Sequence, residues 1–111
     1  MTVTRDQMAL AQLNYIGKPT SVNNVNSLVI WMTSEGGNAT WNPQNTTQNE
    51  PGATQYNSAG VKNYPDIATG LKAFSDTINN GRYAAILTCL EGSSPPAETC
   101  SVIVNSAWGI K

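Results

Sequence analysis

The residue best suited to chemistry in this chain is a glutamate that ends an apolar stretch. Glu35 follows the apolar run 28–32 within one helical turn, and two glycines, Gly36 and Gly37, come directly after it. A carboxylate in the last turn of a helix faces the negative end of the helix dipole, and apolar neighbours reduce its hydration. Both effects favour the protonated carboxyl, which is the form that a general acid needs near neutral pH. The alternative is an exposed glutamate beside a glycine C-cap.

A long polar segment with interspersed aromatic residues follows this glutamate, from residue 38 to residue 63. Sugar rings stack their apolar C–H faces on aromatic side chains, and their hydroxyl and N-acetyl groups hydrogen-bond to amides. The segment therefore predicts a glycan-binding surface, to which we assign Trp41, Asn42, Asn45, Thr46, Tyr56, Asn57 and Tyr64. The alternative for Trp41 and Tyr64 is that they pin the loop to the core.

The remaining chemistry available to the chain is limited by its composition. The chain has no histidine and only two cysteines, so a Ser-His-Asp triad, a Cys-His pair and the usual zinc sites are excluded. We therefore expect no metal or cofactor. Asp66 precedes a helical pattern and is expected to cap a helix. Glu50 lies in the polar segment, where it could assist catalysis, although a solvated loop glutamate is the simpler interpretation.

The length and charge of the chain limit the number of domains and the kinds of partner that we expect. A chain of 111 residues predicts a single domain, residues 1–111. The formal net charge of −1, without a Lys/Arg cluster, argues against a nucleic-acid partner. No apolar run approaches the length of a membrane span. Residues 1–4 lack a basic and apolar leader, so no signal peptide is expected in them.

The elements that must hold these residues are predicted to be mainly α (α+β), with about five helices and a small irregular β-hairpin lobe. Apolar spacing and capping residues place the expected helices at about 4–17, 21–36, 66–81, 82–90 and from Pro95 onward. Short strands are expected at 45–47 and 60–64, where the helical periodicity is absent. Trp31 is expected at the edge of the apolar stripe of the second helix.

Two cysteines flank a Gly-Ser-Ser-Pro-Pro turn between the last two expected helices. We interpret Cys89 and Cys100 as a disulfide that joins these helices, which would indicate an oxidising or extracellular setting. The alternative is a pair of buried free thiols.

A series of motifs, in a fixed order, resembles a known family. The motifs are Trp31, Glu35-Gly36-Gly37, residues 42–47, 51–54, 56–58 and 60–64, Gly70, Gly81-Arg82-Tyr83, Ile86 and residues 105–109. Together they resemble the small lysozyme-like domains of actinobacteria and their phages. These domains belong to the superfamily of goose-type lysozymes, lytic transglycosylases and related glucosaminidases. The resemblance extends from about residue 24 to the end of the chain.

The resemblance implies a lysozyme-like fold and cleavage of the β-1,4 bonds of peptidoglycan glycan strands. It assigns the catalytic glutamate of the superfamily to Glu35, and it puts the segments 42–47 and 60–64, including Val61, along the cleft. Two features depart from lytic transglycosylases, because Gly36 replaces the usual serine and the Gly-Leu-Met-Gln signature is absent. No second carboxylate stands at an obvious position, so hydrolysis and transglycosylation both stay open.

The resemblance also implies a setting and a rival function. The expected setting is a secreted protein, a phage virion or the host cell envelope, where the domain acts as an endolysin-like bacteriolytic enzyme or as part of a larger phage or secreted protein. The rival is a catalytically inactive glycan-binding or phage structural module that has the same fold.

Overall fold

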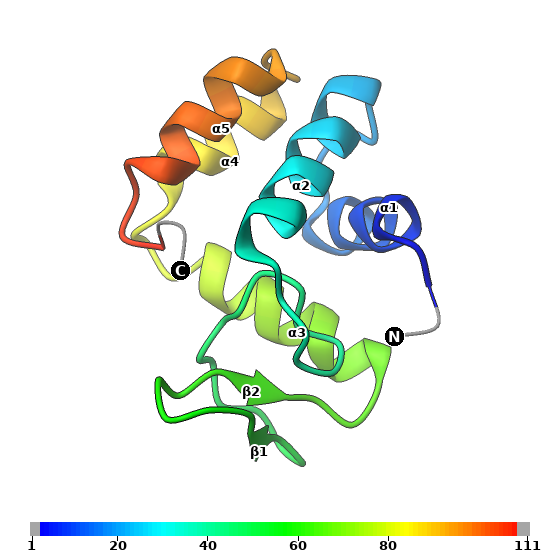
Figure 1. Ribbon diagram of the computed structural model, residues 1–111. Helices are drawn as coiled ribbons and strands as arrows, with labels where there is room; N and C mark the ends of the chain where they lie inside the picture. Colours follow the sequence, from blue (N-terminus) through cyan, green and yellow to red (C-terminus); the bar gives the residue numbers. More distant parts are fainter. Residues whose placement is uncertain (1–2, 109–111) are drawn as a thin grey trace.

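Five helices and one short hairpin make up the computed structural model, which describes residues 3–108 (Figure 1). The helices are α1 (Arg5–Ile16), α2 (Val22–Glu35), α3 (Ile67–Ile78), α4 (Ala84–Glu91) and α5 (Pro96–Val104). The strands β1 (Thr54–Gln55) and β2 (Lys62–Asn63) pair antiparallel. The mainly helical class with a small β element is confirmed. Residues 1–2 of the N-terminal segment and Gly109 of the last motif lie outside the described residues.

The first three helices begin at the capping residues expected from the sequence. Thr4 and Gln7 form a reciprocal capping box at the start of α1. Ser21 accepts a hydrogen bond from the backbone N–H three residues later at the start of α2, and Asp66 does the same for α3. The fourth helix begins at Ala84, two residues later than expected, because the Arg82 N–H bonds to the side chain of Asn80 in the preceding turn.

Aromatic residues from distant parts of the chain form the centre of the core. Trp31 of α2 packs edge-on against Trp108, with ring centroids 4.6 Å apart, and Phe74 of α3 lies 5.8 Å from the Trp31 ring. Tyr83 also packs on Trp108, with ring centroids 5.2 Å apart. Trp31 is only 1% exposed, so its expected position at the edge of a stripe is wrong. Its partners come from other elements, which the spacing within α2 does not reveal.

The polar segment between α2 and α3 folds differently from the two strands expected in it. The second expected strand contains β2, but residues 45–47 form no strand. Asn45 has a φ of 58°, and the side chain of Asn42 both donates to the carbonyl of Thr46 and accepts from its N–H. Such side-chain bonds favour a turn over an extended ladder. The hairpin is formed instead by β1 and β2, where Thr54 pairs with Asn63.

The two cysteines are free thiols, so the disulfide prediction is wrong; of the alternative, a pair of buried free thiols, the burial holds for Cys89, whereas Cys100 is only partly buried. Cys100 of α5 points toward α2, where its Sγ donates a weak hydrogen bond to the Ser27 carbonyl at 3.9 Å. Cys89 is buried in α4. The short spacing between the cysteines correctly indicated that the two helices are joined by a tight turn. It did not show whether the two sulfur atoms face each other.

None of the helices described between residues 3 and 108 has the length and apolarity to cross a membrane.

Candidate functional site

The candidate site is built around the buried carboxylate at the end of α2. Glu35 is 6% exposed, so the alternative of a solvent-exposed glutamate is wrong. Its Oε1 accepts a hydrogen bond from the Nδ2 of Asn45 at 3.3 Å. The same Nδ2 donates to the backbone carbonyl of Glu35 at 3.1 Å. One amide therefore satisfies a carbonyl at the helix C-terminus and holds the side chain of the candidate acid.

Two glycines let the chain reverse directly after Glu35. Gly36 has a φ of 60°, and its N–H bonds to the Met32 carbonyl at 3.0 Å, which ends α2 in a left-handed residue. At Gly37 a Cβ would lie 2.4 Å from the carbonyl oxygen of Pro43. Only glycine permits this close approach, which brings the following loop beneath the end of the helix. We call residues 42–50 the site loop.

Asn45 sits in the site loop in a left-handed conformation, with a φ of 58°. Asparagine tolerates this region better than most residues because its short polar side chain can hydrogen-bond locally. The side chain of Asn45 is partly buried, and both of its donated bonds go to Glu35. Asn45 was expected to bind sugar through its amide, but in the structure that amide orients the candidate acid.

The residue before Asn45 is fixed by a pair of buried amides that the sequence reasoning missed. Gln12 of α1 and Gln44 exchange two hydrogen bonds, at 2.9 and 2.7 Å, and neither residue is more than 1% exposed. The indole Nε1 of Trp108 donates to the Gln44 carbonyl at 2.9 Å. The only sequence signal was that Gln12 occupies an inward position of the helix, among Met8, Ala9 and Leu13.

Most of the other side chains predicted to bind glycan serve as internal supports. Asn42 is buried and also donates to the carbonyl of Lys62 at 2.8 Å. The hydroxyls of Thr46 and Thr77 hydrogen-bond at 2.7 Å, which ties the site loop to α3. Val61 is 3% exposed. The side chains of Asn42 and Thr46 hold the loop in shape, Val61 is buried, and the sugar-binding role of all three residues stays a prediction.

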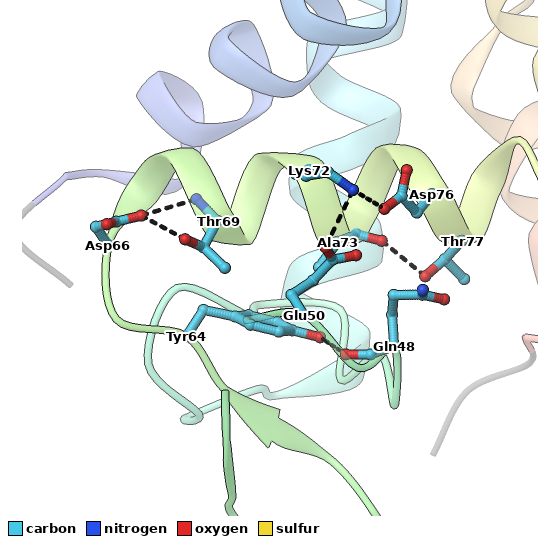
Figure 2. Close-up of polar contacts among 9 residues, drawn as sticks. All are labelled: Gln48, Glu50, Tyr64, Asp66, Thr69, Lys72, Ala73, Asp76 and Thr77. Atoms are coloured by element: carbon cyan, nitrogen blue, oxygen red, sulfur yellow. Dashed lines mark hydrogen bonds and ion pairs between the residues drawn. The ribbon is translucent and has the colours of Figure 1, made fainter. Parts of the chain in front are cut away.

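The two aromatic residues with an open alternative both anchor the polar segment. Tyr64 is 2% exposed, and its hydroxyl donates to the Gln48 carbonyl at 2.5 Å (Figure 2). Trp41 is half-buried with a φ of 55°, and its carbonyl lies so close to Gly70 of α3 that a Cβ there would be 2.3 Å away. Both residues therefore pin the segment, as the alternative proposed.

Two predicted sugar ligands remain on the surface, in the hairpin. Tyr56 is 45% exposed, and Asn57 is exposed with its Oδ1 accepting from the N–H groups of Ala59 and Val61. The hairpin lies at the end of the molecule toward which the C-terminus of α2 points (Figure 1). An aromatic ring on this lobe is available for a sugar to stack on.

A polar cavity lies directly beside the segment that follows Glu35. Its volume is about 280 Å³, and it is lined by Val3, Arg5, Pro43 and residues 37–40. Arg5, Asn38 and Thr40 are the polar residues of this lining, and the Arg5 guanidinium donates to Thr33 on α2 at 3.4 Å. A lining with these hydrogen-bonding residues can bind a ligand rich in hydroxyl and amide groups.

Glu50 is the second buried carboxylate, and its interpretation as a solvated loop residue is wrong. It is 6% exposed, and its Oε1 lies 3.1 Å from the Nζ of Lys72 (Figure 2). The same Nζ lies 2.6 Å from Asp76. Burial, and then the adjacent Asp76 carboxyl, raise the pKa of Glu50. Hydrogen bonds from Lys72 and Glu50 lower the pKa of Asp76.

Glu50 and Lys72 also line an open cavity of about 340 Å³, together with Tyr15, Pro51, Ala68 and Thr69. Between residues 3 and 108, no three side chains of His, Cys, Asp or Glu come together in a way that could hold a metal ion. Glu50 and Asp76 thus form a pair of carboxyl groups that share the ammonium of Lys72 at the surface of α3.

Comparison with known proteins gives no match, because no protein-family model, curated protein or solved structure is significantly similar to this chain.

Proposed function

We propose that this chain is a lysozyme-like domain that cleaves the β-1,4 glycosidic bonds of peptidoglycan, with Glu35 as its general acid. The observation that supports this most is the burial of Glu35 at the end of an apolar helix, where its carboxyl contacts the Asn45 amide. A polar cavity lined by residues 37–40, which follow Glu35 in the chain, and an exposed Tyr56 on the hairpin supply surfaces suited to sugars. The proposed setting is the bacterial cell envelope, reached by secretion or by phage.

The proposed reaction uses one carboxyl group twice. Protonated Glu35 donates its proton to the glycosidic oxygen, the C–O bond breaks, and the departing sugar leaves with a free hydroxyl. The Glu35 carboxylate then accepts a proton from the incoming nucleophile. If the nucleophile is water, the product is a reducing sugar. If it is a hydroxyl of the same sugar, the product is an anhydro sugar. Asn45 would keep the carboxyl oriented through both steps.

A second candidate function is a non-catalytic glycan-binding or phage structural module with the same fold. The observation in its favour is that the polar side-chain groups of Asn42, Thr46 and Tyr64 hydrogen-bond to other residues of the protein. Tyr56 and Asn57 would then form the contact surface for the glycan or for a neighbouring protein.

The deciding experiment compares wild type with Glu35→Gln, which keeps the shape of the side chain but removes its acid. We expect Glu35→Gln to clear a turbid cell-wall suspension at least ~100-fold more slowly, because proton transfer is lost. Its unfolding temperature should stay close to that of wild type. Glu98→Gln, which changes an exposed carboxylate on α5, is the matched control and should keep full activity.

Mass spectrometry of the released muropeptides identifies the product type and separates the two candidates. Reducing ends indicate hydrolysis, and anhydro ends indicate transglycosylation. Full clearing by Glu35→Gln would refute the role of Glu35. A wild-type protein that binds cell walls but releases no muropeptides would support the non-catalytic module.

A further inference from the structure

The contact between Glu50 and α3 is more elaborate than a loop anchor requires. The Glu50 side chain is 3% exposed and rises from the site loop to meet Lys72 at 3.1 Å (Figure 2). Lys72 in turn bonds to Asp76, one helical turn further along α3, at 2.6 Å. Both oxygens of Glu50 are removed from bulk water, since Oε2 is also buried. A carboxyl group that is removed from water does not help to keep a surface loop soluble. The burial of Glu50 therefore indicates a specific role for its side chain.

Three side-chain contacts tie the second half of the site loop to α3 and to Tyr64, and the contact made by Glu50 is the last of them along the chain. The first is the Thr46–Thr77 hydroxyl bond at 2.7 Å, and the second is the bond from the Tyr64 hydroxyl to the Gln48 carbonyl. The Glu50–Lys72 contact closes the series at 3.1 Å. Because Thr46 directly follows Asn45, a movement of this half of the loop would displace the amide that contacts Glu35.

We propose that Glu50 is a positioning residue, which works with Lys72 and Asp76 as a proton-dependent latch that keeps Asn45 against Glu35. The proposal rests on the function proposed for Glu35, because the position of Asn45 matters for chemistry only if Glu35 acts as an acid. Glu50 itself touches no reacting atom.

The proton dependence follows from the charges that face Glu50. Lys72 and Asp76 face it from α3, Tyr64 faces it from the end of β2, and Tyr15 of α1 lines the same cavity. Two carboxyl groups and one ammonium balance only when one carboxyl holds a proton. A raised pKa of Glu50 and a lowered pKa of Asp76 put that proton on Glu50. Burial, and then the Glu50 charge, also raise the pKa of Tyr64, which keeps that hydroxyl a donor.

The sign of the effect differs between the two carboxyl groups. The contribution of Glu50 to stability is complete below its unfolded pKa and is lost as the pH rises through its raised folded pKa. The contribution of Asp76 is present above its unfolded pKa and is lost as the pH falls through its lowered folded pKa. Both contributions are complete only between the unfolded pKa of Asp76 and the unfolded pKa of Glu50, so the latch is tightest there, and it loosens at higher pH as Glu50 loses its proton beside Asp76.

The test follows the side-chain amide of Asn45 by NMR across pH in the full chain. We expect wild type to show a titration step at this amide that Glu50→Gln lacks, because glutamine mimics the protonated carboxyl and cannot ionise. Glu91→Gln, which removes an exposed carboxylate paired with Lys18, is the matched control and should keep the step. The proposal is overturned if Glu50→Gln keeps every step of wild type, or if Glu35→Gln alone removes every step that wild type shows.

A second variant keeps the test valid if Glu50→Gln fails to fold. Asp76 is partly exposed, so Asp76→Asn should fold, and it should move the Glu50-dependent step to lower pH because the neighbouring carboxyl that raises the pKa of Glu50 is removed. In cell-wall assays, kcat should change over the same pH range as the Asn45 amide signal. KM should stay within about 2-fold over that range, because Glu50 does not contact substrate. If the wild-type protein does not cleave cell walls but the NMR step behaves as expected, the latch stands and the proposed function fails.

Discussion

The close contact between α3 and the loop at Trp41 makes Gly70 the position where a single methyl group should be felt most. A Cβ at Gly70 would lie 2.3 Å from the Trp41 carbonyl oxygen and 2.9 Å from the Trp41 Cβ. Ordinary contacts begin at 3.4 Å, so the loop must move away from α3 by about 1 Å. The obstacle is mostly backbone, which cannot rotate aside as a side-chain tip could. We therefore expect Gly70→Ala to shift the whole segment.

The expected magnitude is a balance of two opposed effects. Replacing glycine by alanine inside a helix gains about 1 kcal/mol of helix propensity. Overpacking of this kind costs about 1–3 kcal/mol, and the backbone contact puts Gly70 at the upper end of that range. The net loss should be about 1–2 kcal/mol, which lowers the unfolding temperature of a domain this size by about 5–10 °C. Because the segment leads into Asn45, cell-wall cleavage should fall as well.

Thermal unfolding by circular dichroism, with cell-wall clearing measured in parallel, checks this prediction. Gly92→Ala is the matched control, since Gly92 has a φ of −86° and an added Cβ would meet nothing closer than 3.7 Å. That variant should unfold at the wild-type temperature or slightly above it. If Gly70→Ala is as stable as Gly92→Ala, the loop is not held against α3 as described, and the reasoning fails.

Three further predictions address the rest of the site and the cysteines. Asn45→Gly keeps the left-handed backbone but removes the amide from Glu35, so cell-wall clearing should fall roughly 10-fold or more with little change in unfolding temperature; unchanged clearing would exclude a role for the amide. Gln12→Leu leaves the Gln44 amide buried without its partner and should cost about 1–3 kcal/mol in chemical denaturation, whereas an unchanged midpoint would mean that the pair is dispensable. Denatured, unreduced protein should titrate two thiols, and a titration that finds none would restore the disulfide.

The helix boundaries could be predicted from the sequence because they depend on neighbouring residues. The capping box of Thr4 and Gln7, the N-cap of Asp66 and the left-handed Gly36 all act within one turn of the chain. Glu35 could be identified for the same reason, because the apolar run before it and the glycines after it specify its position at a helix end. Local chemistry was enough for these features.

Most of the features that the sequence did not reveal depend on partners that are distant in the chain. Nothing near Trp31 indicates that Trp108 will pack on it, and nothing near Gln44 indicates an amide partner 32 residues earlier in α1. The burial of Glu50 likewise depends on Lys72, which lies on a helix that folds back over the loop. The left-handed φ of Asn45, which excludes the strand expected there, was signalled only weakly by the residue type.

The contacts on either side of Asn45 come from opposite parts of the chain, and this has a consequence for the candidate site. Gln44 is held by α1 and by the indole of Trp108, whereas Thr46 is held by α3. The left-handed residue between them is thus fixed from both sides, which is the preorganisation that the proposed general acid would require. Glu35 and Asn45 are only ten residues apart, yet the position of their contact is set by residues from both ends of the described chain. A fragment that kept the two site residues but lacked α1 or α3 would therefore retain the chemical groups and lose the geometry that relates them.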